Sequence, residues 1–170
     1  MGNYSDFEYD FIDRTLAVIS QYESNLHKYE FKEQYNYTLL LNCLTGLIVM
    51  PKERIIDMIP KDRLITDMKN QMGLHDTQIN PEITTVKDLV IQMRHCVAHF
   101  SIRIESENGD FLVDKIVFYD DDRAPGYIVA TFKATELLPF VRYYADWLKS
   151  NLEVSRRYKQ MRVAAQGAKS

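Results

Sequence analysis

The amino-acid sequence predicts a mainly α-helical bundle with a small antiparallel β-sheet inserted before the last helix. Apolar residues recur at three- and four-residue steps along most of the chain, which is the spacing of one buried helix face. Between residues 102 and 133 this spacing gives way to alternation and a turn signal, and it returns from residue 135. A chain of 170 residues, 46% hydrophobic and 26% charged, is typical of one globular domain. We expect a single domain over residues 1–158 and a flexible basic tail over residues 159–170.

Two long helices are expected in the first part of the chain. The first runs from Asp6, a suitable N-cap, to about Lys28. Its inward side comprises Phe11, Ile12, Leu16, Ile19, Tyr22 and Leu26. The second, Glu33–Met50, is apolar nearly all round, which indicates a central helix, and Pro51 ends it. Asn42 is its polar exception and is expected to be a satisfied core amide or to support a neighbouring site.

The middle of the chain is expected to contain only short elements. Lys52–Ile59 predicts a short helix, and Lys61–Gln71 a further turn or two. Gly73–Thr85, which contains an Asn-Pro pair, predicts a loop. Thr84 or Thr85 is the expected N-cap of the next helix, because a threonine hydroxyl can accept a hydrogen bond from the first turn.

The pattern of strands follows that helix. Alternating apolar residues predict two strands: Ile102, Ile104, Phe111, Val113, Ile116 and Phe118. Glu107–Asp110, with the sequence Glu-Asn-Gly-Asp, is a hairpin turn signal between them. A third strand is expected at Gly126–Lys133, after an acidic loop at Asp120–Asp122 that we expect to be solvated. The last helix is predicted from Thr135 to about Tyr158, with Leu138, Val141, Tyr144, Ala145, Leu148 and Leu152 facing inward.

The stretch Asp88–Ile104 carries the most informative helix. Its expected core side is Leu89, Val90, Met93, Val97 and Phe100. At about 100° per residue, the opposite face collects Ile91, His95, Ala98 and Ile102, with His99 beside them and Arg94 at one edge. A solvent-facing helix would carry Lys, Glu or Gln there. The isoleucines and the small alanine frame a polar cluster, so we expect this face to contact another molecule.

Arg94 and His99 form an Arg-x4-His pattern, and His95 directly follows the arginine. In this context the chain resembles the HEPN superfamily, small helical bundles that carry an Arg-x4–6-His motif on a late helix. The resemblance also covers residues 11–22 and the run TLLLNCLTGLIVMPKE at 38–53, and it extends to about Tyr158. The chain looks like a member of a plasmid- or phage-associated branch of this superfamily. The resemblance implies a HEPN-like fold and a metal-independent ribonuclease of toxin–antitoxin, abortive-infection or RNA-guided defence systems.

The chemistry of RNA cleavage suits these residue types. Without a metal ion, attack by the ribose 2′-OH needs a proton acceptor, a proton donor for the leaving 5′-oxygen, and positive charge on the phosphorane. Histidine as a residue type can donate or accept a proton near neutral pH, so His99 suits proton transfer, and Arg94 offers a permanently charged fork to phosphate oxygens. The resemblance gives His95 a supporting role. We expect Arg94 and His99 to be catalytic, a 2′,3′-cyclic phosphate product, and neither metal nor cofactor.

The spacing of Arg94 and His99 favours a site shared by two chains. Five residues place them about 140° apart on an ideal helix, so one chain presents an incomplete set. Two such helices around a two-fold axis would bring both pairs into one cleft. Ile91, Ala98 and Ile102 suit such a self-contact. The resemblance implies the same composite site, so we expect a homodimer that binds RNA.

Other interpretations stay open. A catalytically silent HEPN module would bind RNA, a nucleotide or a protein partner, such as an antitoxin or regulatory protein. A structural dimer would use Arg94, His95 and His99 as interface contacts. The i, i+4 spacing of the histidines also matches paired zinc ligands, but the helical pattern turns Cys96 toward the core. Ser101 stands where HEPN toxins paired with a nucleotidyltransferase antitoxin carry a modified tyrosine, so that regulation is not implied.

Charge and location limit the possible partners. Residues 156–170 hold five basic residues and no acidic one, which leaves 16 basic against 24 acidic residues elsewhere. Non-specific RNA affinity comes from neutralising phosphates, which the acidic part of the chain before residue 156 does poorly. We therefore expect RNA to bind at a local site or in a groove formed by more than one chain. No apolar run reaches the length of a membrane span, and the start MGNYSDFEYD lacks a signal-peptide core, which predicts a cytoplasmic protein without membrane contact. Cys43 and Cys96 are expected to be buried reduced thiols.

Overall fold

The computed structural model describes residues 4–49, 61–107 and 112–167. The helices are α1 (Phe7–Asn25), α2 (Asn36–Val49), α4 (Thr66–Gln71), α5 (Val86–Ala98) and α6 (Leu137–Gly167). The strands are β1 (Gln78–Ile79), β2 (Ile102–Glu105), β3 (Lys115–Tyr119) and β4 (Ile128–Lys133), and the 3-10 turns are η1 (Leu26–Lys28), η2 (Phe31–Glu33) and η3 (Ala134–Glu136).

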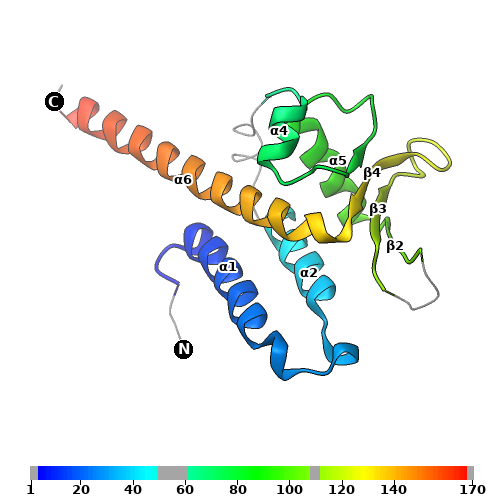
Figure 1. Cartoon of the computed structure of the whole chain (residues 1–170). Helices are drawn as coiled ribbons and strands as arrows, with labels where there is room; N and C mark the ends of the chain where they lie inside the picture. The colour runs from blue at the N-terminus through cyan, green and yellow to red at the C-terminus, as the bar shows by residue number, and fades with distance from the viewer. Residues whose placement is uncertain (1–3, 50–60, 108–111, 168–170) are drawn as a thin grey trace.

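In Figure 1, α6 crosses the molecule diagonally, with α1 and α2 below it and the sheet near its first turns. The predicted mainly helical class with a small antiparallel sheet is confirmed. The short helix predicted at Lys52–Ile59 and residues 108–110 of the predicted turn lie outside the described residues.

Helix α1 begins as predicted and packs against α2 and α6. The Asp6 side chain caps it by accepting a hydrogen bond from the Tyr9 N–H at 3.2 Å. Gly46 of α2 lets the two helices approach closely, because a Cβ there would lie 3.0 Å from Cζ of Phe11. The two N-terminal helices therefore form one layer beneath α6.

Helix α2 is the central helix, as its composition predicts, and it contacts α1, α5 and α6. Leu40, Leu44, Leu47 and Ile48 are buried. The prediction that Asn42 is a core amide is wrong, because this side chain is exposed. It lies about 200° around the helix from both Leu40 and Leu44, on the side opposite these buried residues.

The sheet contains the predicted hairpin and one strand more. β2 pairs antiparallel with β3, with Ile102 opposite Phe118, and β3 pairs with β4. The other edge of β4 pairs with β1, a two-residue strand in the segment predicted as a loop. Val113, predicted within a strand, precedes β3. The buried ring of Phe132 lies 5.3 Å from that of Phe140, which joins the sheet to α6.

A buried carboxylate fixes the junction between the sheet and α6. Glu136 of η3 is only 6% exposed. It accepts hydrogen bonds from the backbone N–H groups of His75, Asp76 and Thr77 and from the Thr77 hydroxyl, at 2.6–3.0 Å. A buried carboxylate needs such donors to offset its lost hydration. These bonds tie the segment before β1 to the start of α6.

The last helix is longer than predicted. α6 continues past Tyr158 to Gly167, so the backbone of residues 159–167 is helical. The residues predicted to face inward are buried, apart from Leu138, which is partly buried against the core. The domain boundary at residue 158 and the flexibility of the basic tail stay predictions.

Candidate functional site

Helix α5 begins at the predicted cap. The Thr85 hydroxyl accepts a hydrogen bond from the Asp88 N–H at 3.1 Å. Leu89, Val90, Met93 and Cys96 are buried against the core, and Val97 is partly buried. This packing fixes the rotation of the helix and turns Ile91, His95 and Ala98 to its outer side, as the periodicity predicts.

A Schellman motif ends α5 directly after the Arg-x4-His pattern. The Ser101 N–H donates to the Cys96 carbonyl at 2.7 Å, and the Phe100 N–H donates to the Val97 carbonyl at 3.2 Å. Phe100 adopts the left-handed backbone conformation (φ 55°) that this motif requires, and among the described residues it is the one non-glycine with positive φ. Glycine usually occupies this position because a Cβ is strained there.

The reversal at Phe100 corrects two predicted positions. Phe100 was expected on the core side, but it is 86% exposed because the left-handed turn swings its side chain outward. Ile102 was expected on the outer helix face beside His95, but it lies in β2 opposite Phe118. The apolar frame of the polar cluster therefore consists of Ile91, Ala98 and Phe100, all exposed.

His95 and His99 lie together at the end of α5. Their ring centroids are 4.3 Å apart, and the His99 N–H donates to the His95 carbonyl at 3.0 Å, which preserves the one-turn spacing. The side chains are 40% and 53% exposed, respectively. The two imidazoles are thus adjacent and open to solvent on one side.

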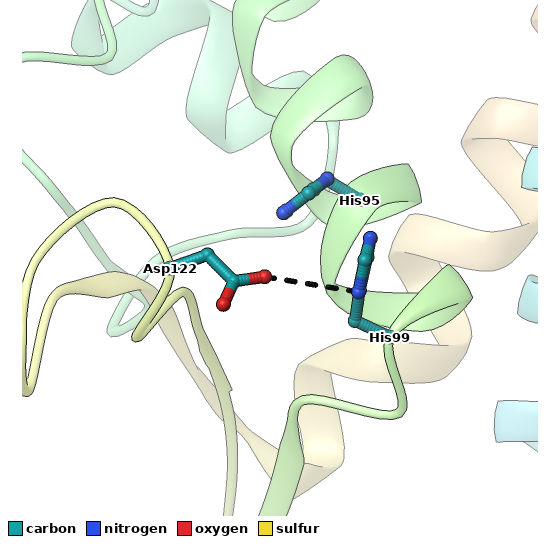
Figure 2. Close-up of side chains that lie close together, drawn as sticks. All are labelled: His95, His99 and Asp122. Atoms are coloured by element: carbon teal, nitrogen blue, oxygen red, sulfur yellow. Dashed lines mark ion pairs between the residues drawn. The ribbon is translucent and has the colours of Figure 1, made fainter.

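The loop between β3 and β4 brings carboxylates to these histidines. Oδ1 of Asp120 lies 3.4 Å from Nε2 of His95, and Oδ2 of Asp122 lies 3.8 Å from Nδ1 of His99. Figure 2 shows His95, His99 and Asp122 pointing toward one another. We call these three side chains the His–Asp cluster. A helix end and a sheet loop therefore build it jointly.

Hydrogen bonds hold this loop in place. Asp120 is buried and its Oδ1 accepts from the Arg123 N–H at 3.1 Å, while Oδ1 of Asp121 accepts from the Gly126 N–H at 2.8 Å. The expectation of a wholly solvated acidic loop is wrong for Asp120, because its carboxylate closes the turn. A further anchor is Glu82, whose Oε2 accepts from Arg123 Nη2 at 2.8 Å.

Sequence reasoning missed the link between the acidic loop and the motif. The predicted hairpin was the feature from which this link could have been inferred. Because β2 and β3 run antiparallel, with Ile102 opposite Phe118, the residues after β3 must lie beside the residues before β2. The Tyr119 N–H donates to the Ser101 carbonyl at 3.1 Å and continues this pairing toward the end of α5. Asp120–Asp122 and His99 are neighbours for that reason.

On an ideal helix, Arg94 lies about 100° from His95 and about 140° from His99. It is partly buried, and its charge acts on Tyr144 of α6. Burial raises the pKa of Tyr144, and the positive charge of Arg94 opposes part of that rise. The structure therefore brings His95 and His99 together within one chain, whereas the charge of Arg94 acts on Tyr144 of α6.

Cys96 is the free, buried thiol that the sequence predicts. Burial, and next the negative charge of Asp120, raise its pKa to about 12. Metal ions bind the thiolate form of cysteine, which this environment disfavours. Cys43 is free and half-buried, and burial raises its pKa as well.

Comparison with protein families decides the membership of the chain. The model of the family described as HEPN pEK499 p136 matches residues 1–155. The chain belongs to this HEPN family. The resemblance drawn from the Arg-x4-His pattern and the helical segments is thereby confirmed. No curated protein and no solved structure matches the chain significantly.

The HEPN assignment agrees with the mainly helical architecture around α2, α5 and α6. It supports a ribonuclease-like or binding HEPN module as the class of the chain. In the part of the chain that the structure describes, every helix is too short or too polar to cross a membrane.

Proposed function

We propose that this HEPN protein is a metal-independent endoribonuclease that cleaves RNA through attack by the ribose 2′-OH. The observation that carries the proposal is the pair of adjacent imidazoles of His95 and His99, 4.3 Å apart and half-exposed at the end of the motif helix. Imidazoles donate and accept protons near neutral pH, which both steps of the reaction need. His99 transfers the proton, His95 assists it, and the product carries a 2′,3′-cyclic phosphate.

The site is proposed to form between two copies of the chain. Within one copy, Arg94 and His99 lie about 140° apart around the helix, so we propose that the positive charge on the phosphate near one His99 comes from Arg94 of a second copy. The exposed Ile91, Ala98 and Phe100 supply apolar surface for this contact. An isologous dimer would place both α5 helices around one axis and complete the site twice.

One observation favours a second candidate. Asp120 and Asp122 put two carboxylates beside the histidines, and negative charge disfavours the approach of an RNA phosphate. A catalytically silent HEPN module that binds RNA, a nucleotide or a protein partner fits this feature. In the nuclease proposal, Arg94 from the second copy offsets these carboxylates.

The proposed biological setting is that of HEPN toxins or defence ribonucleases. HEPN membership supports this setting. An antitoxin or regulatory protein would then restrain the nuclease, and a cytoplasmic location would give it access to RNA.

The test is cleavage of total RNA and a tRNA pool by the purified protein in EDTA. His99→Ala and Arg94→Ala are compared with His27→Ala, an exposed histidine on η1 that serves as matched control. The proposal expects cyclic-phosphate ends from the parent and from His27→Ala, and loss of cleavage by at least about 100-fold in the other two variants. A silent parent would contradict it and favour the binding module.

Sedimentation of the same variants separates catalysis from interface contacts. If Arg94 and His99 are catalytic, both alanine variants keep the parent's dimer content while they lose cleavage. If the residues only hold an interface, both variants lose the dimer, and the proposed roles are wrong.

A further inference from the structure

The His–Asp cluster has the composition of a transition-metal site. One donor atom from each of His95, His99 and Asp122 lies within 4.8 Å of the other two. Zinc prefers imidazole nitrogen and carboxylate oxygen at about 2 Å, which places neighbouring ligand atoms roughly 3.3 Å apart. Small rotations of side chains that are 40% to 76% exposed cover this difference.

The surroundings of the cluster favour a dication. The carboxylate of Asp120 lies 3.4 Å from Nε2 of His95 and adds negative charge beside the three donors. Asp120 is itself fixed by the Arg123 N–H, so this charge cannot swing away. A bound dication would be attracted by these carboxylates, whereas an RNA phosphate is repelled by them.

The donor set selects the class of ion. Two nitrogens and one oxygen suit zinc or a similar first-row transition metal, whereas calcium and magnesium prefer oxygen alone. The backbone hydrogen bond from His99 to the His95 carbonyl keeps the i, i+4 spacing of paired zinc ligands. The sequence did not favour zinc, because Cys96, the nearby cysteine, was expected to face the core. The structure places Asp122 beside the two histidines, and its carboxylate supplies the third donor.

We propose that His95, His99 and Asp122 bind one zinc ion per chain and that zinc switches off RNA cleavage reversibly. The second half rests on the proposed nuclease function. A nitrogen lone pair that binds zinc cannot accept a proton, so an occupied cluster loses the imidazole that the proton transfer uses. Removal of zinc by a chelator frees the imidazole and restores RNA cleavage.

Zinc binding is tested first, without RNA, by competition between the metal-free protein and a chromophoric zinc chelator. The proposal expects one zinc per chain, and an affinity loss of at least about tenfold in each of His95→Ala, His99→Ala and Asp122→Asn. His27→Ala, outside the cluster, should bind zinc like the parent. Equal binding by all these proteins, or no binding by the parent, would overturn the site.

The switch is tested by the ratio of cleavage rates with and without zinc. The proposal expects this ratio to fall at least about tenfold for the parent and for His27→Ala, and to stay near one for Asp122→Asn. Bound zinc with undiminished cleavage would overturn the switch. If the parent cleaves no RNA, the nuclease and the switch both fail, while the binding result still decides the zinc site.

Discussion

Nε2 of His95 lies 3.4 Å from Oδ1 of Asp120, a carboxylate that is almost fully buried at the start of the β3–β4 loop. The same oxygen accepts a hydrogen bond from the Arg123 N–H, so the loop backbone fixes it. A fixed charge next to a half-exposed ring restricts how that ring can turn. Asp120 is therefore proposed as a positioning residue for His95.

Replacing Asp120 by Asn tests this positioning role. The Asn side-chain oxygen can still accept the Arg123 N–H, so the loop and the melting temperature should change little. Loss of the charge frees His95, and we expect kcat of RNA cleavage in EDTA to fall about tenfold. KM should not rise, because one carboxylate fewer repels the RNA phosphate. Asp121→Asn is the matched control, because this carboxylate contacts Gly126 in the same loop. An equal fall in both variants would contradict a specific role for Asp120.

Replacing Phe100 by Gly should stabilise the protein. Phe100 holds φ 55° while 86% exposed, so packing does little to offset its backbone strain. Glycine removes a strain of about 1–2 kcal/mol but adds freedom to the unfolded chain. We expect a net gain of about 0.5–1 kcal/mol in urea unfolding at protein concentrations too low for the proposed dimer, where the contact of Phe100 with a second copy is absent.

Gly126→Ala is the control for Phe100→Gly. Gly126 also has positive φ (73°), and a Cβ there would meet nothing within 4 Å, so only backbone strain is introduced. Its free energy of unfolding should fall by about 1 kcal/mol. A Phe100→Gly variant less stable than the parent at this low concentration would contradict the assigned backbone strain.

Replacing Glu136 by Gln should destabilise the junction between the sheet and α6. The Glu136 carboxylate accepts four hydrogen bonds with two charged oxygens. A glutamine side chain has one uncharged oxygen to accept them, and its NH₂ group would face backbone N–H groups. We expect a loss of about 1–3 kcal/mol in urea unfolding and faster hydrogen exchange at Thr77. Glu153→Gln on the exposed side of α6 should stay within about 0.5 kcal/mol of the parent. Similar stability of the two variants would refute the structural role of Glu136.

The buried thiol of Cys96 predicts a loss of stability at high pH. The unfolded thiol ionises near its ordinary pKa of 9.0, whereas the folded one does so at about 12. Because the folded pKa is raised, its stabilising contribution is complete below pH 9 and disappears as the pH rises toward 12. The difference in unfolding free energy between the parent and Cys96→Ala should therefore shrink over this range. A difference independent of pH would contradict the assigned pKa.

Local patterns predicted much of the fold. The three- and four-residue spacing identified the long helices, and Thr85 identified the start of α5, because both depend on residues close together in sequence. The end of α5 escaped prediction because Phe100 occupies a position where glycine is the usual signal. β1 escaped because a strand of two residues has too little alternation to be recognised.

The candidate site was predicted in part. Arg94, His95 and His99 came from one helix, so the sequence could name them together. Asp122 reaches His99 only through the register of β2 on β3 and the hydrogen bonds that fix the next loop. Such contacts depend on tertiary pairing, which the periodicity of a single segment does not contain.

The central claim is a composite, metal-independent nuclease, and mixing two inactive variants tests it most directly. Arg94→Ala and His99→Ala chains are co-expressed, and the heterodimer is assayed for RNA cleavage in EDTA. We expect restored cleavage, because the intact His99 of one chain meets the intact Arg94 of the other. A heterodimer as inactive as either variant, beside an active parent, would contradict the composite site and place both groups within one chain.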